Sequence, residues 1–530
     1  MLTKGKFNYL IFFSLAIYSF FINFYYASIG VFPIDTFTFF DTGYSVTIGK
    51  HPIKDFWIIS GIFGDYLQAL FFKIFGVNWK SYVYHSSTLN LTVTLVFYFF
   101  LNKLGLKNFE SFLFSISLAT LCYPVVGTPF TYLHSYLLSI VSLLIFFLGI
   151  LTNKKIFFLI LPIFMFLSFF SMQLPSGLIN LIILLSLLYY IFPFKKNWNL
   201  IKYFFIGSLI SFSSLIFYLL IIGISFRSFL DQYIFFPFSF GFERIVSNEN
   251  AFEGAKLSKK FNFKSLILDF KFIHIFLFSY FILLVSKMKK YFKDIKKYLI
   301  IDITIILSIF CFIFHQLITA NQIFIFSLIP LIASLLYLRI SQEVSNNKIY
   351  KILIILILIF STVKYHQRFN LDRKFMEFQN IDLSKSVDAS LIDQKFFGLK
   401  WISPEFSENP LEEVDLINAI TQILKKDDRK KMIITHHQFF SSILNEDLNI
   451  PNRWYYPDNT FPASKSNTYF ETYKSFFINK INNEKIEVIY IIMVNPSIWQ
   501  NIYLNYFDEG CYETKNVNEL LISIDLKNCS

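Results

Sequence analysis

The chain has 530 residues, of which 55% are hydrophobic and only 16% are charged, and its mean hydropathy is +0.52. A soluble domain carries about 25% charged residues, so this composition excludes a protein that is soluble throughout. The net charge of +12 would indicate nucleic-acid binding in a soluble protein, but here much of the positive charge lies between hydrophobic segments, which is typical of membrane topology.

Hydrophobic segments recur along the first two thirds of the chain, each of about 20 residues, the length that crosses a hydrocarbon core. We predict about eleven spans, and therefore a mainly α, polytopic transmembrane helical bundle over residues 1–366. The spans are expected at 9–31, 83–101, 109–126, 135–152, 156–173, 177–193, 203–224, 270–286, 298–315, 322–338 and 349–365. No small-residue cleavage site follows the first span, which is expected to remain as an anchor.

The connectors between these spans alternate in charge. One set is rich in basic residues, including Lys103, Lys107, Lys154, Lys155, Lys195, Lys196 and Arg339. The other set, at 127–135, 173–176 and 315–322, contains neither Lys nor Arg. The positive-inside rule assigns the first set to the cytoplasm. We therefore predict a bacterial inner-membrane protein with a cytoplasmic N-terminus and with two outer loops, at 32–82 and 225–269.

The first outer loop (32–82) gathers charge in a protein that otherwise avoids it, and charge held at a bilayer surface usually marks a site. A carboxylate there can act as a general base, carboxylates can hold a divalent cation such as Mg²⁺ or Mn²⁺, and cations can bind a phosphate. The candidates are Asp35, Asp41, Asp55, Lys50, His51 and Lys54. The alternative is that the carboxylates cap helices and the lysines contact lipid headgroups. Further along this loop, Asp65, Gln68 and Lys73 recur with a helical period, which favours an interfacial helix over 61–76.

Polar side chains in the other outer connectors could line the same cavity. All eight histidines fall on the outer side or near the outer ends of spans, either by chance and interfacial preference or because a polar cavity lies there. The candidates for lining are His134, Gln173, His315, Gln316 and Asn321, and Arg227 and Arg244 of the second outer loop are further candidates for binding a phosphate.

The composition changes after residue 366, where charges of both signs and turn clusters appear. Helices are expected at 411–426 and 469–482, and buried strands at 431–435 and 486–492. This alternation predicts a soluble periplasmic α/β domain over 367–530. Two of the four cysteines, Cys511 and Cys529, could pair in an oxidising compartment.

Part of the first outer loop resembles a known family. The residues that carry the likeness are Asp41-Thr42-Gly43-Tyr44, then Gly49-Lys50-His51-Pro52-Ile53-Lys54-Asp55-Phe56-Trp57, then Gly61, Tyr66-Leu67 and Phe75-Gly76. They resemble the first outer loop of the GT-C superfamily of polytopic glycosyltransferases, which includes protein mannosyltransferase-like and aminoarabinose transferase-like enzymes. The likeness covers about 50 residues strongly and the rest in layout only.

The resemblance implies a catalytic base in this loop, a donor sugar on a polyprenyl phosphate, and transfer at the outer face. By position it assigns the base to Asp41, with Asp35 as the alternative, while Asp55 and Tyr44 would orient the loop. The chain departs from the family pattern at Thr42, where many relatives have a second acidic residue, at Ile53, where Tyr is common, and at Ser60-Gly61-Ile62. These departures leave the metal and the sugar unassigned; Asp35 and Asp41 would be the ligands of any metal.

The expected activity is transfer of a hexose or pentose, with inversion, to a glycan, lipid or protein acceptor, in polysaccharide or glycolipid biosynthesis of the cell envelope. No nucleic-acid partner is expected. A lipid-linked polysaccharide polymerase or ligase that relies on Arg227 and Arg244 is an alternative, and a lipid-linked sugar flippase or a non-catalytic scaffold are others. The sequence leaves open the sugar, the acceptor and the length of the prenyl chain.

Overall fold

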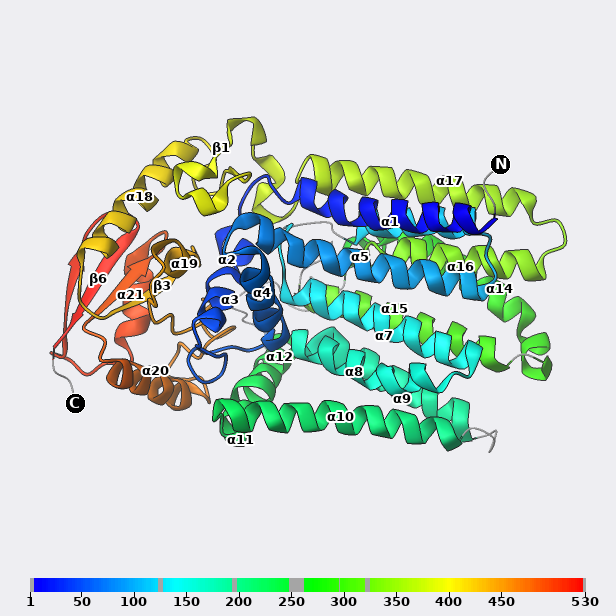
Figure 1. Cartoon of the computed structure of the whole chain (residues 1–530), viewed down its shortest axis with the longest axis horizontal. Coiled ribbons are helices and arrows are strands. Elements are labelled where there is room, and N and C mark those ends of the chain that lie inside the picture. Colours follow the sequence, from blue (N-terminus) through cyan, green and yellow to red (C-terminus); the bar gives the residue numbers. More distant parts are fainter. Residues whose placement is uncertain are drawn as a thin grey trace.

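The computed structural model describes residues 4–122, 127–192, 198–246, 262–294, 296–319 and 325–527. Figure 1 shows long helices that run side by side, with a smaller group of strands and helices, from the C-terminal residues, at one end of them. Arg244 lies in a described helix although its side chain is outside the description, and Asn321 and Cys529 lie outside the described residues.

Every predicted span overlaps a helix of the bundle within the described residues. The helices are α1 (Lys4–Tyr26), α5 (Trp79–Leu104), α6 (Asn108–Leu121), α7 (Thr131–Thr152), α8 (Lys155–Ser171), α9 (Gln173–Ile191), α10 (Trp198–Ile222), α14 (Lys271–Asp294), α15 (Lys296–Thr319), α16 (Leu328–Glu343) and α17 (Lys348–Tyr365). Six of the helices in the described residues are long and apolar enough to cross a membrane, those that contain Tyr9–Tyr26, Thr131–Thr152, Gln173–Ile191, Trp198–Ile222, Lys297–Thr319 and Lys348–Leu371. The chain is thus mainly helical with several membrane-length helices, and the count of eleven crossings stays a prediction.

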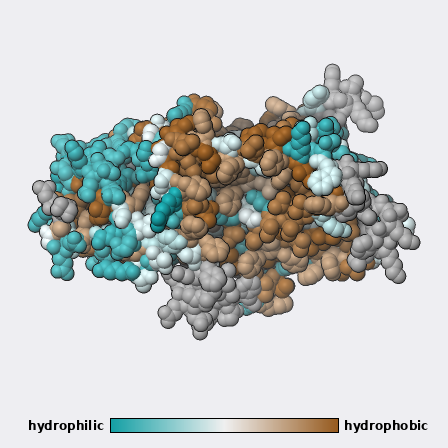
Figure 2. Space-filling model, turned by 90° about the horizontal axis from the view of Figure 1, so that it is seen from below, coloured by the Kyte–Doolittle hydropathy of each residue, from teal (hydrophilic) through white to brown (hydrophobic). Residues whose placement is uncertain are grey.

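The surface of the bundle is apolar. Helix α7 lies at its centre, with every residue from Thr131 to Ile150 buried, whereas α10 exposes Phe217 and Leu220. Such faces suit contact with lipid tails, which offer no penalty for exposed apolar side chains. In Figure 2 the hydrophobic surface covers the bundle and gives way to a hydrophilic surface over the C-terminal end.

Short helices cross the end of the bundle nearest the C-terminal part. Helix α1 stops at Tyr26, earlier than the predicted span, because Gly30 takes a left-handed φ of 81° and Pro33 starts a new helix. The crossing helices are α2 (Pro33–Thr36), α3 (Phe40–Thr47), α4 (Ile62–Phe75), α11 (Phe226–Leu230), η2 (Asp231–Phe235), α12 (Phe236–Val246) and η3 (Lys264–Leu268).

The C-terminal part contains a four-stranded mixed sheet in the order β3-β4-β6-β5. Strands β3 and β4 pair in parallel, and the two pairs that include β6 are antiparallel. Both predicted buried strands and both predicted helices are present. The elements are α18 (Pro410–Lys426), β3 (Lys431–Thr435), α19 (Phe440–Leu444), α20 (Phe470–Glu484), β4 (Val488–Ile492), α21 (Pro496–Leu504), β5 (Tyr512–Asn516) and β6 (Leu521–Leu526). Between α17 and α18 lie η4 (His366–Leu371), η5 (Met376–Asn380), η6 (Leu383–Lys385), β1 (Val387–Asp388), η7 (Ala389–Leu391), η8 (Gln394–Phe396) and β2 (Lys400–Trp401).

Residues 32–82, the segment predicted to be the first outer loop, share one hydrophobic core with the C-terminal part. The ring of Phe37 stacks on Trp401 with centroids 6.0 Å apart and meets the edge of Phe439 at 4.9 Å. A short parallel bridge adds backbone contacts, since Trp57 N donates to Pro451 O at 2.7 Å and Arg453 N donates to Trp57 O at 3.1 Å. The loop is therefore held between the bundle and the C-terminal part.

Candidate functional site

Asp41, the carboxylate that the family resemblance singles out, is buried at this junction. It lies in the first turn of α3, and its two oxygens accept hydrogen bonds from Ser441 N at 3.1 Å and Ser442 N at 3.0 Å. These amides belong to the start of α19, so Asp41 satisfies donors that the helix itself leaves unpaired. Burial raises the pKa of Asp41 to about 7, against the lowering effect of the two amides.

A second buried carboxylate lies on α4 and forms an ion pair with the C-terminal part. Asp65 Oδ2 is 3.2 Å from Arg453 Nη1, and both side chains are buried. Burial raises the pKa of Asp65 to about 6, although the Arg453 guanidinium lowers it. Arg453 Nη2 has no hydrogen-bond partner, and a Cβ at Gly61 would lie 2.3 Å from Nη1, so the guanidinium requires glycine there.

A chain of polar side chains continues from α4 into the bundle. The Gln68 side-chain amide is 2.9 Å from His85 Nδ1, and His85 Nε2 is 2.7 Å from His134 Nε2. His134 Nδ1 lies 2.7 Å from Phe130 O and must donate to it, so in a neutral pair His85 Nε2 is the donor to His134. His85 Nδ1 is then an acceptor, so the Gln68 side-chain amide donates to it through its nitrogen.

The predicted cations of the first outer loop are held by other groups. Lys50 Nζ lies 2.5 Å from Glu484 Oε1 and 3.2 Å from Asp447 Oδ2, so its charge is compensated. His51 Nδ1 is 2.8 Å from the Tyr66 hydroxyl, and burial lowers the pKa of this histidine. Lys54 is exposed and donates to Ile222 O at 2.9 Å.

A lysine of the C-terminal part, Lys480, enters the same region. Its Nζ donates to Asp55 O at 2.5 Å, and the Asp55 carboxylate accepts the His51 backbone N–H at 2.6 Å. Lys480 is almost fully buried, and burial lowers its pKa to about 8. The Asp55 carboxylate thus closes the turn at His51, and its role in a functional site stays a prediction.

Among the described residues, the other predicted site residues contact different groups. Gln173 Nε2 donates to Ile59 O and Tyr233 O, both at 2.6 Å, and so ties α9 to the crossing segments. Arg227 is almost fully exposed and pairs with Asp231 at 3.6 Å. His315 and Gln316 are buried near the end of α15.

Asp35 and Tyr44 lie on the first two crossing helices. Asp35 is buried in α2, and its backbone carbonyl accepts the Thr38 hydroxyl at 2.7 Å. Tyr44 is buried in α3, and the nearby Asp41 is among the groups that raise its pKa, after burial itself.

Sequence reasoning did not identify Arg453, Lys480 or the contact between Gln68, His85 and His134. A signal for Arg453 exists, since it is a lone cation followed directly by Trp454-Tyr455-Tyr456, where a charge in an apolar run needs a partner. Within the described ranges, no three His, Cys, Asp or Glu side chains are grouped so that they could hold a metal ion.

Comparisons with known proteins assign no family to this chain. No protein-family model matches the chain, and no curated protein matches it.

Proposed function

We propose that this protein is an integral-membrane glycosyltransferase that transfers a sugar from a polyprenyl-phosphate donor to an acceptor hydroxyl, with Asp41 as the general base. The observation that carries the proposal is the state of Asp41, a buried carboxylate in the first outer loop whose pKa is raised to about 7. A base works best when its pKa lies near the operating pH. The proposal includes the finer topology: eleven crossings, a cytoplasmic N-terminus, and a periplasmic α/β domain over 367–530.

The reaction would be a single displacement at the anomeric carbon. The acceptor oxygen forms a bond to that carbon as its proton passes to Asp41, and the bond to the phosphate oxygen breaks, so polyprenyl phosphate leaves with the electron pair. Asp41 later returns the proton to water. The configuration at the anomeric carbon inverts.

Access to Asp41 requires movement of α19. Both carboxylate oxygens accept an amide of that helix and the side chain is fully buried, so a hydroxyl reaches Asp41 only after Ser441 and Ser442 withdraw. Arg453 is the cation we assign to the departing phosphate, because its Nη2 is buried without a partner while Lys50 is already held by two carboxylates. A desolvated guanidinium binds phosphate more strongly than an exposed lysine does.

The test is release of polyprenyl phosphate from a panel of polyprenyl-phosphate sugars by the purified full-length protein in lipid nanodiscs, with and without Mg²⁺ or Mn²⁺. We expect Asp41→Asn to lower the rate by about 100-fold or more, the contribution of a general base. Asp65→Asn tests which of the two buried carboxylates is the base. If Asp65→Asn lowers the rate more than Asp41→Asn does, the base is Asp65 on α4. Asp525→Asn, which changes a half-buried carboxylate on β6 that pairs with Arg429, is the control and should retain full activity.

The alternatives give different results in the same assay. A polysaccharide polymerase or ligase that relies on Arg227, which is exposed on the crossing helix α11, would lose activity in Arg227→Ala and keep a near-normal rate in Asp41→Asn. A flippase would exchange labelled lipid-linked sugar across the membrane and release no polyprenyl phosphate.

A further inference from the structure

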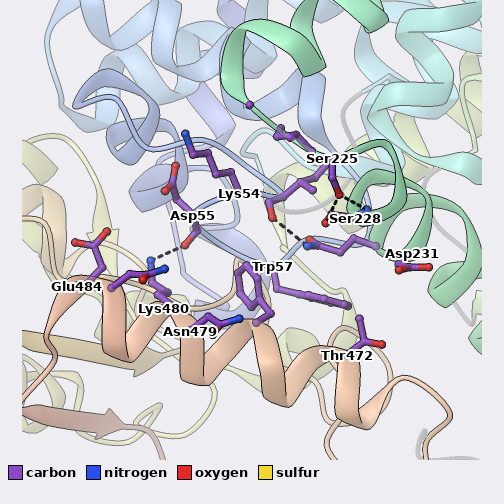
Figure 3. Close-up of a pocket in the computed structure, with 16 residues that line it drawn as sticks. Lys54, Asp55, Trp57, Ser225, Ser228, Asp231, Thr472, Asn479, Lys480 and Glu484 are labelled. Carbon is purple, nitrogen blue, oxygen red and sulfur yellow. Dashed lines mark hydrogen bonds between the residues drawn. The ribbon is translucent and has the colours of Figure 1, made fainter. Parts of the chain in front are cut away.

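A pocket of about 430 Å³ opens between the crossing segments and the C-terminal part. Three stretches that are distant in sequence line it: residues 53–57 of the first outer loop, residues 223–232 after α10, and the face of α20 from Thr472 to Glu484. Figure 3 shows the side chains of Trp57, Asp231, Thr472 and Asn479 arranged around this space. The pocket differs from the Asp41 and Asp65 positions, neither of which lines it.

The charged groups on the pocket wall already have partners. Its three carboxylates are those of Asp55, Asp231 and Glu484; Glu484 pairs with Lys50, and Asp231 pairs with Arg227. Its two lysines both donate to backbone carbonyls, Lys54 to Ile222 O and Lys480 to Asp55 O. An anionic ligand would have to displace these bonds, so a neutral or cationic ligand fits better.

The remaining wall combines aromatic rings with short polar groups. Trp57 and Phe476 form an edge-to-face pair with centroids 5.6 Å apart, and both line the pocket. The polar residues that could meet a ligand are Ser225, Ser228, Thr472, Asn479 and Asn483. Gln232 also lines the pocket, but it is buried and its amide already bonds Ile53 O and Ile58 N. Amides and hydroxyls both donate and accept hydrogen bonds, as the hydroxyls of a sugar do, while the C–H face of a pyranose packs on an aromatic ring.

We propose that this pocket binds a carbohydrate, a neutral or amino-sugar segment of the acceptor. In naming the acceptor, the inference rests on the proposed glycosyl transfer. The pocket would hold a part of the acceptor glycan away from the reacting hydroxyl. A sugar face would pack on Phe476, which the buried Trp57 supports from behind, and the sugar hydroxyls would bind Asp231 and the asparagines of α20. The acceptor is then a glycan or glycolipid rather than a protein.

The test is binding of three sets of oligosaccharides, namely neutral, amino-sugar and uronate or phosphorylated, to the full-length protein in nanodiscs, measured by saturation-transfer NMR and titration calorimetry. We expect binding from the first two sets only. Asn479→Ala removes one or two hydrogen bonds and should weaken binding about tenfold, while Asn479→Trp fills the pocket from an exposed position and should abolish it. Glu471→Ala, at an exposed position of α20 that does not line the pocket, is the matched control.

Three results would overturn the inference: no binding of any neutral or amino oligosaccharide, preference for the anionic set, or equal affinity in Asn479→Trp with an unchanged thermal midpoint. The outcomes also separate this inference from the proposed function. If polyprenyl phosphate is released and Asn479→Trp leaves the acceptor KM unchanged, the transferase stands and the carbohydrate pocket is wrong. If oligosaccharides bind and the Asn479 variants weaken that binding, but no polyprenyl-phosphate donor is cleaved, the carbohydrate pocket is supported and the proposed transferase activity is wrong.

Discussion

Asp41 connects two parts of the chain that are 400 residues apart, because Ser441 N donates to its carboxylate. The same side chain caps α19 and, in the proposed function, accepts a proton. The two amide hydrogen bonds favour the charged carboxylate, whereas desolvation favours the neutral form and is the larger effect. Asp65 is in a similar position on α4, but there Arg453 supplies a compensating charge.

The pH dependence of stability follows from the direction of these two pKa shifts. Asp41 has a pKa of about 7 in the folded protein against 3.8 for the ordinary carboxyl, so the folded state holds its proton more tightly. Its stabilising contribution is therefore complete below pH 3.8 and is lost as the pH rises through 7, at no more than about 1.4 kcal/mol per pH unit for a single group. Asp65 acts in the same direction, with a folded pKa of about 6.

We expect Asp41→Asn to gain thermal stability relative to the unmodified protein as the pH is raised from 4.5 to 7.5, because only the unmodified protein pays for ionising this buried carboxyl. The comparison with the unmodified protein cancels groups of opposite effect, such as His436, whose pKa burial lowers to about 4. Asp65→Asn should show part of this gain, while Asp525→Asn should show none. An identical pH profile in Asp41→Asn and in the unmodified protein would contradict the assignment of the raised pKa to this residue.

At the scale of elements, α4 has a polar face turned inward and an apolar face turned outward. Asp65 and Gln68 are buried, while Leu70, Ile74 and Phe75 are largely exposed. A helix in water would have the opposite arrangement, so this one is suited to the lipid boundary at the end of the bundle.

The orientation of α4 can be measured with lipid-attached quenchers. A bimane label on Ile74→Cys should be strongly quenched by nitroxide-labelled lipid, because this exposed position lies on the apolar face. The same label on Lys465→Cys, an exposed position of the C-terminal part, should be quenched little. Equal quenching at the two positions would show that α4 does not face lipid.

The elements were largely predictable from sequence, and their contacts were not. Hydrophobic segments determine where α7 and α10 lie, and the polar period of 61–76 predicts α4, because each pattern is local. The partner of Asp65 is 388 residues away and that of Lys50 is 434 residues away, and no local pattern carries such a pairing. For this reason the sequence could single out Asp41, but it could not predict that the Asp41 carboxylate caps α19.

At the scale of the whole molecule, an apolar bundle ends in a hydrophilic part that rests on the first outer loop (Figure 2). The proposed chemistry requires this hydrophilic end to lie on the periplasmic side of the inner membrane, where the sugar donor is a polyprenyl phosphate and not a nucleotide. Sidedness is thus the property on which the proposed function depends.

Cysteine labelling tests the sidedness. In a background with Cys122, Cys311, Cys511 and Cys529 replaced by serine, a membrane-impermeant maleimide should label Lys465→Cys in spheroplasts with an intact inner membrane. Lys154→Cys, in the exposed connector between α7 and α8, should be labelled only after that membrane is permeabilised. The reverse pattern would place Asp41 inside the cell and remove the basis of the proposed transfer.

The core shared between Phe37, Trp401 and Phe439 also constrains how the protein is made. The ribosome releases the first outer loop early, yet the rings that cover it are synthesised near the end. Until then, the aromatic side chains of the loop must be shielded by lipid or by a chaperone. A nonsense mutation just after α17 would leave those rings uncovered in an otherwise inserted bundle, and the truncated chain would become a substrate for membrane proteases.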